Sequence, residues 1–266
     1  MNKYIYKVGH SVHMALDPYI RKAMTDYKKM KKYENSCTKK RCFIIGNGPS
    51  LTIKDLDLLQ SEDCFAMNRI YQIFPRTKWR PKYYLCQDWL VLLDIKKDID
   101  YIISECENVF LSSSIKNKLG RDYIKNEHVA FYYQNIQQTF PQKPNFSFNI
   151  GSSVYEGGTV AYSAIQLAVN MGYKEIYLLG IDHNYKFITK EDGSYDFDRN
   201  DGNNYMNGIK VGGEQYIPDM DRNTLSYVKA KDVCDEKGII IANCTRGGKL
   251  EVFKRINLDD LFKGEL

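Results

Sequence analysis

Short runs of apolar residues recur along the chain and alternate with longer stretches that have helical character. Runs without an alternating polar face are typical of strands buried on both sides of a parallel sheet. Strands are expected at residues 42–45, 64–67, 83–86, 109–111, 129–132, 174–180 and 239–242, and helices at residues 53–59, 159–171 and 225–237. This alternation predicts an α/β fold with a doubly wound, mostly parallel sheet.

Two regions fall outside the alternation. Residues 11–33 predict a basic helix, because Val12, Leu16, Ile20 and Met24 recur on one face. A polar stretch rich in Gly, Asn and Asp at residues 184–219 predicts a long loop. We therefore expect a basic helical appendage over residues 1–38 and an α/β domain over residues 39–266.

The composition is that of an ordinary globular protein, with 43% hydrophobic and 27% charged residues among 266. The seven cysteines include no C-x-x-C pair, which argues against a disulfide framework or a zinc ribbon and favours a reducing compartment. No apolar run approaches the ~18 residues of a membrane span, and the N-terminus lacks the features of a secretory signal. We expect a cytoplasmic protein.

The net charge of +5 is unevenly distributed. Residues 1–41 hold eleven Lys and Arg against three Asp and Glu, so the remaining residues sum to −3. The lysines at positions 28, 29, 31 and 32 suit a solvated helix end, or alternatively a peripheral contact with anionic lipid at the inner face of the cell membrane. Because the body of the chain is not basic, we expect no nucleic-acid partner. The sequence is also compatible with a homo-oligomer.

Candidate site residues follow the predicted strands, because ligands of open α/β sheets bind outside the carboxyl ends of the strands. These positions are unusually rich in amides and charges. They are Gly46, Asn47, Gly48, Pro49 and Ser50, then Asn68 and Arg69, Gln87 and Asp88, Gly180 with Asp182 and His183, and residues 243–248.

The turn at residues 46–50 is the sharpest of these features. Two glycines allow the backbone to approach a ligand closely, and a following helix would offer free N–H groups to a phosphate. Leu51 stands where a dinucleotide motif has its third glycine, and no Gly-Lys-Ser/Thr follows, so the turn is neither that motif nor a P-loop. The alternative is a tight strand-to-helix turn without a ligand.

Asp182 and His183 are candidates for acid–base chemistry. A histidine can act as a general base near neutral pH, whereas an aspartate can bind a ribose, an acceptor hydroxyl or a metal. The alternative is a structural histidine.

The predicted loop carries acids that resemble metal motifs. Asp196-Phe197-Asp198 is similar to a D-x-D signature, but it does not follow a strand. As a calcium loop, the segment would have Gly202 one place late and Asn207 in place of the bidentate glutamate. We therefore expect solvated acids and no bound metal.

Four segments, residues 42–51, 67–71, 158–160 and 172–182, resemble the superfamily of motility accessory factor (Maf)-like and MptE-like proteins. They are also similar to the bacterial sialyltransferases of glycosyltransferase family 42. The resemblance runs in patches from residue 41 to about residue 262. It implies a modified Rossmann-like fold and a CMP-activated sugar donor, used without a bound metal or another cofactor.

By position, the resemblance implies donor contacts. Asn47, Gly48 and Ser50 would hold the nucleotide phosphates and ribose, and Asn68 would orient the donor. Gln87 or Asp88 would add a further contact. The pair Gly158 and Thr159, at the start of the long helix, would lie near the cytidine.

The residues at the catalytic positions of the sialyltransferases differ in this sequence. Asp221-Arg222-Asn223 stands near the position of the family's histidine, and Asn184, followed by Tyr185, stands near the catalytic tyrosine. Gly157 replaces an arginine. We therefore assign the base to His183 and a positioning role to Asp182.

The sequence thus predicts a glycosyltransferase that moves a sugar from a nucleotide-sugar to a surface-polysaccharide or glycolipid acceptor. Two alternatives stay open. One is an MptE-like diphosphokinase that uses ATP and Mg²⁺ held by acids such as Asp88 and Asp182. The other is a non-catalytic protein that binds a nucleotide-sugar.

Overall fold

The computed structural model of the protein describes residues 27–120, 124, 126–137, 139–189, 192–198, 203–212 and 216–263. Its centre is an eight-stranded sheet of order β12-β11-β8-β1-β2-β3-β4-β5 in which every neighbouring pair is parallel. The strands are β1 (Arg41–Ile45), β2 (Cys64–Met67), β3 (Tyr83–Cys86), β4 (Asn108–Ser112), β5 (Val129–Tyr132), β8 (Glu175–Leu179), β11 (Ile240–Asn243) and β12 (Lys254–Arg255). All seven predicted strands are confirmed; β12 was not predicted.

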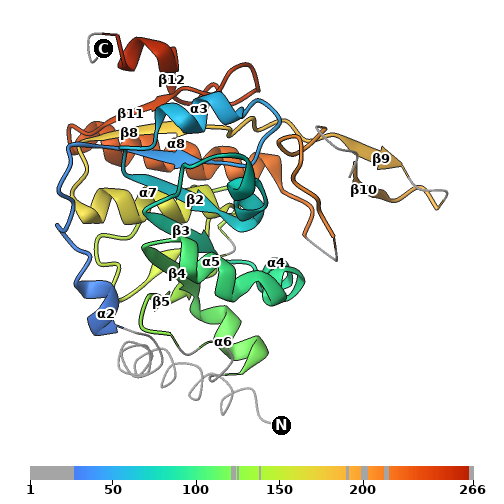
Figure 1. Cartoon of the computed structure of the whole chain (residues 1–266), viewed down its shortest axis with the longest axis horizontal. Coiled ribbons are helices and arrows are strands. Elements are labelled where there is room, and N and C mark those ends of the chain that lie inside the picture. Colours follow the sequence, from blue (N-terminus) through green and yellow to red (C-terminus); the bar gives the residue numbers. More distant parts are fainter. Residues whose placement is uncertain are drawn as a thin grey trace.

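Helices cover both faces of the sheet (Figure 1). They are α2 (Tyr27–Lys31), α3 (Ile53–Leu58), α4 (Trp89–Ile95), α5 (Ile99–Glu105), α6 (Ser113–Leu119), α7 (Val160–Met171) and α8 (Met220–Glu236), with the 3₁₀ helices η1 (Asn68–Arg76), η2 (Lys96–Asp98) and η3 (Leu258–Leu261). Ile44 of β1 faces the cluster that contains α7 and α8, whereas Phe43 and Ile45 face the cluster that contains η1, α4 and α5. Successive strand side chains therefore enter two separate cores.

The long helix predicted at residues 159–171 is α7, and its ends follow from local chemistry. The Thr159 side chain caps the N-terminus by accepting a hydrogen bond from the Ala161 N–H. Gly172 ends the helix in the left-handed conformation, with φ +99°. The predicted helices at residues 53–59 and 225–237 correspond to α3 and α8.

The prediction of one long loop at residues 184–219 was wrong. Strands β9 (Phe187–Thr189) and β10 (Tyr195–Phe197) form an antiparallel hairpin that projects from the α/β body (Figure 1). The turn is built by Asp192, whose carboxylate accepts hydrogen bonds from the backbone and hydroxyl of Ser194, and by Gly193 with φ +79°. A second small pair, β6 (Gln134–Asn135) and β7 (Val154–Tyr155), is parallel.

The described part of the N-terminal segment packs against the domain. Met30 of α2 is fully buried in the core, and the Tyr33 hydroxyl donates to the Asn108 side chain at 2.8 Å. Cys37 N–H donates to the Met171 carbonyl. The apolar face predicted at residues 12–24 lies outside the described residues, and a domain boundary at residue 38 stays a prediction. No helix in the described part of the chain is long and apolar enough to cross a membrane.

Candidate functional site

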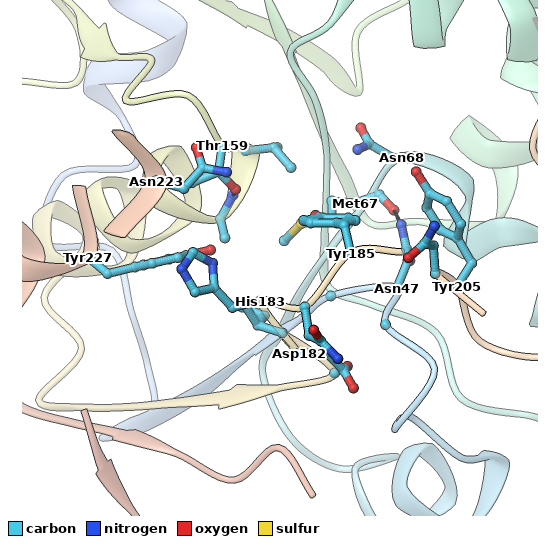
Figure 2. A pocket seen from close by; sticks show the side chains of 18 residues that line it. Asn47, Met67, Asn68, Thr159, Asp182, His183, Tyr185, Tyr205, Asn223 and Tyr227 are labelled. Atoms are coloured by element: carbon cyan, nitrogen blue, oxygen red, sulfur yellow. Dashed lines mark hydrogen bonds between the residues drawn. The ribbon is translucent and has the colours of Figure 1, made fainter. Parts of the chain in front are cut away.

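A pocket opens at the carboxyl ends of β1, β2 and β8, where the sequence predicted a site. Figure 2 shows His183, Tyr227, Asn223 and Thr159 on one side of this pocket and Asn47, Asn68 and Tyr205 on the other. Eight of the predicted site residues line it: Gly46, Asn47, Gly48, Asn68, Thr159, Gly180, Asp182 and His183. The strand ends therefore bring together residues that are up to 137 positions apart in the sequence (from Gly46 to His183).

The turn passes so close to the end of β8 that two of its positions have no room for a side chain. Gly46 N–H donates to the Leu179 carbonyl and Gly48 N–H to the Gly180 carbonyl, both at 2.8 Å. A Cβ atom on Gly46 would lie 2.3 Å from the Gly180 carbonyl oxygen, and one on Gly48 would lie 1.9 Å from Asp182 Oδ2. The close turn thus has a structural cause of its own, and its contact with a phosphate stays a prediction.

The Asp182 carboxylate belongs to this turn. Its Oδ2 atom accepts a hydrogen bond from the Ser50 hydroxyl at 2.8 Å. Burial raises the pKa of Asp182, and the hydrogen bonds from Ser50 partly offset that rise. No hydrogen bond joins Asp182 to the His183 ring among the described residues. Asp182 therefore positions the turn rather than the imidazole.

His183 is held by a chain of hydrogen bonds that fixes its tautomer. Its Nε2 atom lies 2.8 Å from Thr224 Oγ1, and the Thr224 hydroxyl donates to the Met220 carbonyl at 2.8 Å. Because the threonine proton is engaged there, Thr224 Oγ1 accepts the proton of Nε2–H. The Nδ1 atom then carries the free lone pair. The Tyr227 ring packs edge-to-face against the imidazole, with ring centroids 5.6 Å apart.

The charge state of His183 suits a base. Burial lowers its pKa below the ordinary value of 6.5, so the imidazole is neutral at pH 7. Its backbone has φ +50°, a left-handed conformation that is unfavourable for a residue with a Cβ atom. Strain of this kind is often retained at functional sites.

Two asparagines that line the pocket each have a buried acceptor atom without a partner in the described part of the chain. Asn47 Nδ2 donates to the Met67 carbonyl at 3.0 Å, but its Oδ1 atom is buried without a partner among the described residues. Asn68 Oδ1 is in the same situation, and Asn68 has φ +53°. A buried polar atom left unpaired costs about 1–3 kcal/mol. Both oxygens therefore keep an unused capacity to accept a hydrogen bond, and their contact with a donor stays a prediction.

The remaining predicted donor residues do not line the pocket. Asp88 caps α4 by accepting from Leu90 N–H at 2.8 Å, and burial raises the pKa of its carboxyl group. The Gln87 side chain accepts from the Ser163 hydroxyl. The Arg69 side chain pairs with Asp94. Pro49, Ser50 and Gly158 also lie outside the lining, so these six assignments stay predictions.

Sequence reasoning placed Asn223 of α8 near the position of the family's histidine, but it assigned no site role to Tyr227 or to the segment after β10. Asn223 and Tyr227 come from α8, and Asn204 and Tyr205 follow the hairpin. Burial raises the pKa of Tyr227 to about 12, so its hydroxyl is neutral and can donate a hydrogen bond. A possible signal was the run of Asn and Tyr at residues 203–205.

Where the structure describes them, the acids that resemble metal motifs, for which no bound metal was expected, do not line the pocket. Asp196 is on β10, and the Asp198 side chain accepts from Asn203 Nδ2 at 2.6 Å. Positions 201 and 202 of the calcium-like pattern lie outside the described residues. Within the described ranges, no group of three or more His, Cys, Asp or Glu side chains could hold a metal ion.

A sequence model of the family described as 6-hydroxymethylpterin diphosphokinase MptE-like matches residues 19–187. The chain belongs to this family. A search of curated proteins with the sequence of this chain found no match. Residues 19–187 include the turn, Asn68, Asp182 and His183, whereas the wall contributed by α8 lies beyond the match.

A solved structure shares the fold of this MptE-like protein. The Maf glycosyltransferase from Magnetospirillum magneticum AMB-1 gives a TM-score of 0.53 at 15% identity, over 90% of this chain and 38% of that protein. This chain therefore spans well under half of the Maf protein. The sialyltransferase CstII from Campylobacter jejuni, in complex with CMP-3FNeuAc, gives 0.45 at 19% identity, over 82% of this chain and 86% of that one.

Proposed function

We propose that this MptE-like protein transfers a glycosyl group from a nucleotide-sugar to a hydroxyl group of a polysaccharide or glycolipid acceptor. The donor is one whose leaving group is a nucleoside monophosphate, with a CMP-sugar as the best fit. The proposal is compatible with the fold shared with the Maf glycosyltransferase. It is carried by the charge of the pocket.

The residues that line the pocket favour a ligand of low charge. Among the described residues that line it there is no Lys or Arg, and the ionisable side chains include Asp182 and a neutral His183. Val160 and Ala161, at the N-terminus of the 12-residue helix α7, also line it. A helix N-terminus carries roughly half a positive charge, which suits the single negative charge of a CMP-sugar phosphodiester. Nucleoside di- and triphosphates are usually held by Lys, Arg or Mg²⁺.

The amides supply the rest of the donor site. Asn47 and Asn68 each have an unpaired Oδ1 atom that would accept from ribose hydroxyls or from the amino group of a base. Their position across the pocket from Thr159 allows one nucleotide to contact both sides (Figure 2). Ser50 would contribute by supporting the turn through its hydrogen bond to Asp182.

His183 would act as the general base. In the reaction, its Nδ1 atom takes the proton of the acceptor hydroxyl while the hydroxyl oxygen attacks the anomeric carbon of the sugar. The bond between that carbon and the phosphate oxygen breaks, and the nucleoside monophosphate leaves with the electron pair. Asp182 is a positioning residue that acts through Ser50 and the turn.

The acceptor would approach from the β9–β10 hairpin. In the sequence, the two strands of the hairpin lie between Tyr185 and Asn204, which both line the pocket. The hairpin side chains of Phe187 and Tyr195 are 39% and 65% exposed. Exposed aromatic side chains on a hairpin joined at both ends to a pocket wall are suited to contact with a further ligand. Replacing Tyr195 with Ser should raise the KM for the acceptor without changing the affinity for the donor. A cytoplasmic location with peripheral membrane contact, and a homo-oligomer, stay proposals from the sequence.

The competing function is the diphosphokinase activity that gives the family its description. It would require ATP and Mg²⁺, with Asp88 and Asp182 as candidate acids. A thermal-shift screen of CMP, UDP and Mg·ATP separates the functions, because a ligand at 100 times its Kd adds roughly 2.7 kcal/mol of stability. We expect CMP to stabilise the protein most. Stabilisation by Mg·ATP alone would favour the kinase, and binding without turnover would favour a non-catalytic role.

A further inference from the structure

The segment at residues 203–212, which we name the strap, joins the hairpin region to the pocket. Asn204 and Tyr205 of the strap line the pocket, and Met206 N–H donates to the Asn47 carbonyl at 2.7 Å. Met206 and Ile209 are each only 3% exposed and pack into the core. The strap is therefore part of the wall that faces the proposed donor.

Three side chains of η1 hold the outer half of the strap, and we name them the clasp. Gln72 makes two hydrogen bonds with Lys210: its Nε2 atom donates to the carbonyl at 3.0 Å, and its Oε1 atom accepts from the N–H at 2.7 Å. Arg76 donates to the Asn207 carbonyl at 2.6 Å, and Arg69 donates to the Gly212 carbonyl at 3.2 Å. Each bond reaches the strap backbone, so the clasp fixes its path.

The clasp brings η1 and the strap into close contact. A Cβ atom on Gly208 would lie 2.5 Å from Arg76 Nη1, and one on Gly212 would lie 3.0 Å from Asp94 Oδ1. Asp94 is also the ion-pair partner of Arg69, whose side chain is almost fully buried. The guanidinium group is thus already engaged by α4 and the strap, and it does not line the pocket.

We propose that Arg69, Gln72 and Arg76 are positioning residues that hold the strap closed, so that Asn204 and Tyr205 form one wall of the nucleotide site. This assigns Arg69, predicted from its place after β2 as a donor contact, a role that acts through the strap instead. The effect on nucleotide affinity rests on the proposed function. The attachment of the strap does not.

The test uses Gln72→Ala, because Gln72 is half-buried and the change removes both bonds to Lys210 without opening the core. Hydrogen exchange of the unliganded protein should show the Lys210 and Met206 amides exchanging about tenfold faster, as expected for the loss of neutral hydrogen bonds. The matched control is Gln60→Ala, at an exposed glutamine for which no side-chain hydrogen bond is seen among the described residues. It should leave strap exchange unchanged.

A second pair of variants separates positioning from general stability. Arg76→Ala should accelerate strap exchange, and Arg76→Lys, which keeps a donor for the Asn207 carbonyl, should restore protection. If the strap is open in nine molecules of ten, the Kd for CMP rises about tenfold. The kcat measured at saturating donor should change by less than about twofold.

Unchanged exchange of the strap amides in both Gln72→Ala and Arg76→Ala would overturn the clasp. Faster exchange with an unchanged Kd for CMP would overturn the positioning role. If the wild-type protein binds no nucleotide, the proposed function fails, while the exchange measurement still decides whether the clasp exists.

Discussion

Replacement of His183 by Asn tests the catalytic base with the least disturbance of the backbone. His183 has φ +50°, and asparagine tolerates this left-handed conformation better than alanine does. A loss of rate in His183→Asn can therefore be attributed to the lost imidazole rather than to strain. Removal of a positioned base typically costs ~10²–10⁴ in rate, so we expect kcat to fall by that factor while the Kd of the donor changes little.

The pH dependence gives a second readout of the same variant. Burial lowers the pKa of His183 below 6.5, and protonation of Nδ1 would remove the lone pair that accepts the acceptor's proton. The wild-type kcat should therefore be constant near pH 7 and should fall as the pH drops through this lowered pKa. The assay follows release of the nucleoside monophosphate from pH 5 to 8 at saturating donor. His183→Asn should lose the acidic limb.

Two variants of Thr224 test whether the tautomer of His183 matters for catalysis. Thr224→Val removes the oxygen that accepts from Nε2–H, and the loss of one neutral hydrogen bond corresponds to a roughly tenfold lower population of the active arrangement. Thr224→Ser keeps the hydroxyl and should stay near the wild-type kcat. If His183→Asn keeps kcat within about threefold, or keeps the acidic limb, His183 is not the base. Asp219 and Asp221, at the start of α8, would then be the next candidates.

Two further predictions concern the donor site, and a third concerns metal. Asn68 has φ +53°, a conformation that glycine also adopts without strain, so Asn68→Gly should leave the fold intact while it removes the unpaired Oδ1 atom. Calorimetry should therefore show an approximately tenfold weaker nucleotide affinity. Gly48→Val should abolish nucleotide binding. Because its Cβ atom would meet Asp182 at 1.9 Å, it should also lower Tm by roughly 2–12 °C, and an unchanged Tm and affinity would refute the close turn. Turnover should persist in EDTA, whereas activity that disappears and returns with Mg²⁺ or Mn²⁺ would favour a metal site and the diphosphokinase.

The sheet could be predicted from the sequence because its strands are buried on both faces. Residues such as 42–45 and 64–67 are apolar without interruption, and a run of this kind is stable only where both faces of the strand are buried. The hairpin was missed because its strands have only three residues each and lie within a polar stretch. Asp192-Gly193 was the available signal, since an Asp-Gly pair between short β-prone runs favours a hairpin.

The site could be predicted only in part, because the end of a strand fixes where a residue lies and not where its side chain points. Asn47 and Asn68 lie at strand ends and line the pocket, whereas Asp88, in an equivalent position, turns back to cap α4. Tyr227 lies within a helix, and helical periodicity alone does not reveal which face meets a cleft.

Product analysis tests the central claim most directly. The protein is incubated separately with a CMP-sugar, a UDP-sugar and Mg·ATP with 6-hydroxymethylpterin, and the nucleotide products are separated by chromatography. The charge of the pocket and the neutral His183 predict release of CMP from the CMP-sugar, with water taking the place of the acceptor hydroxyl. This release should persist in EDTA and should be lost in His183→Asn. Conversion of ATP to AMP with an intact CMP-sugar would contradict the account and identify a diphosphokinase.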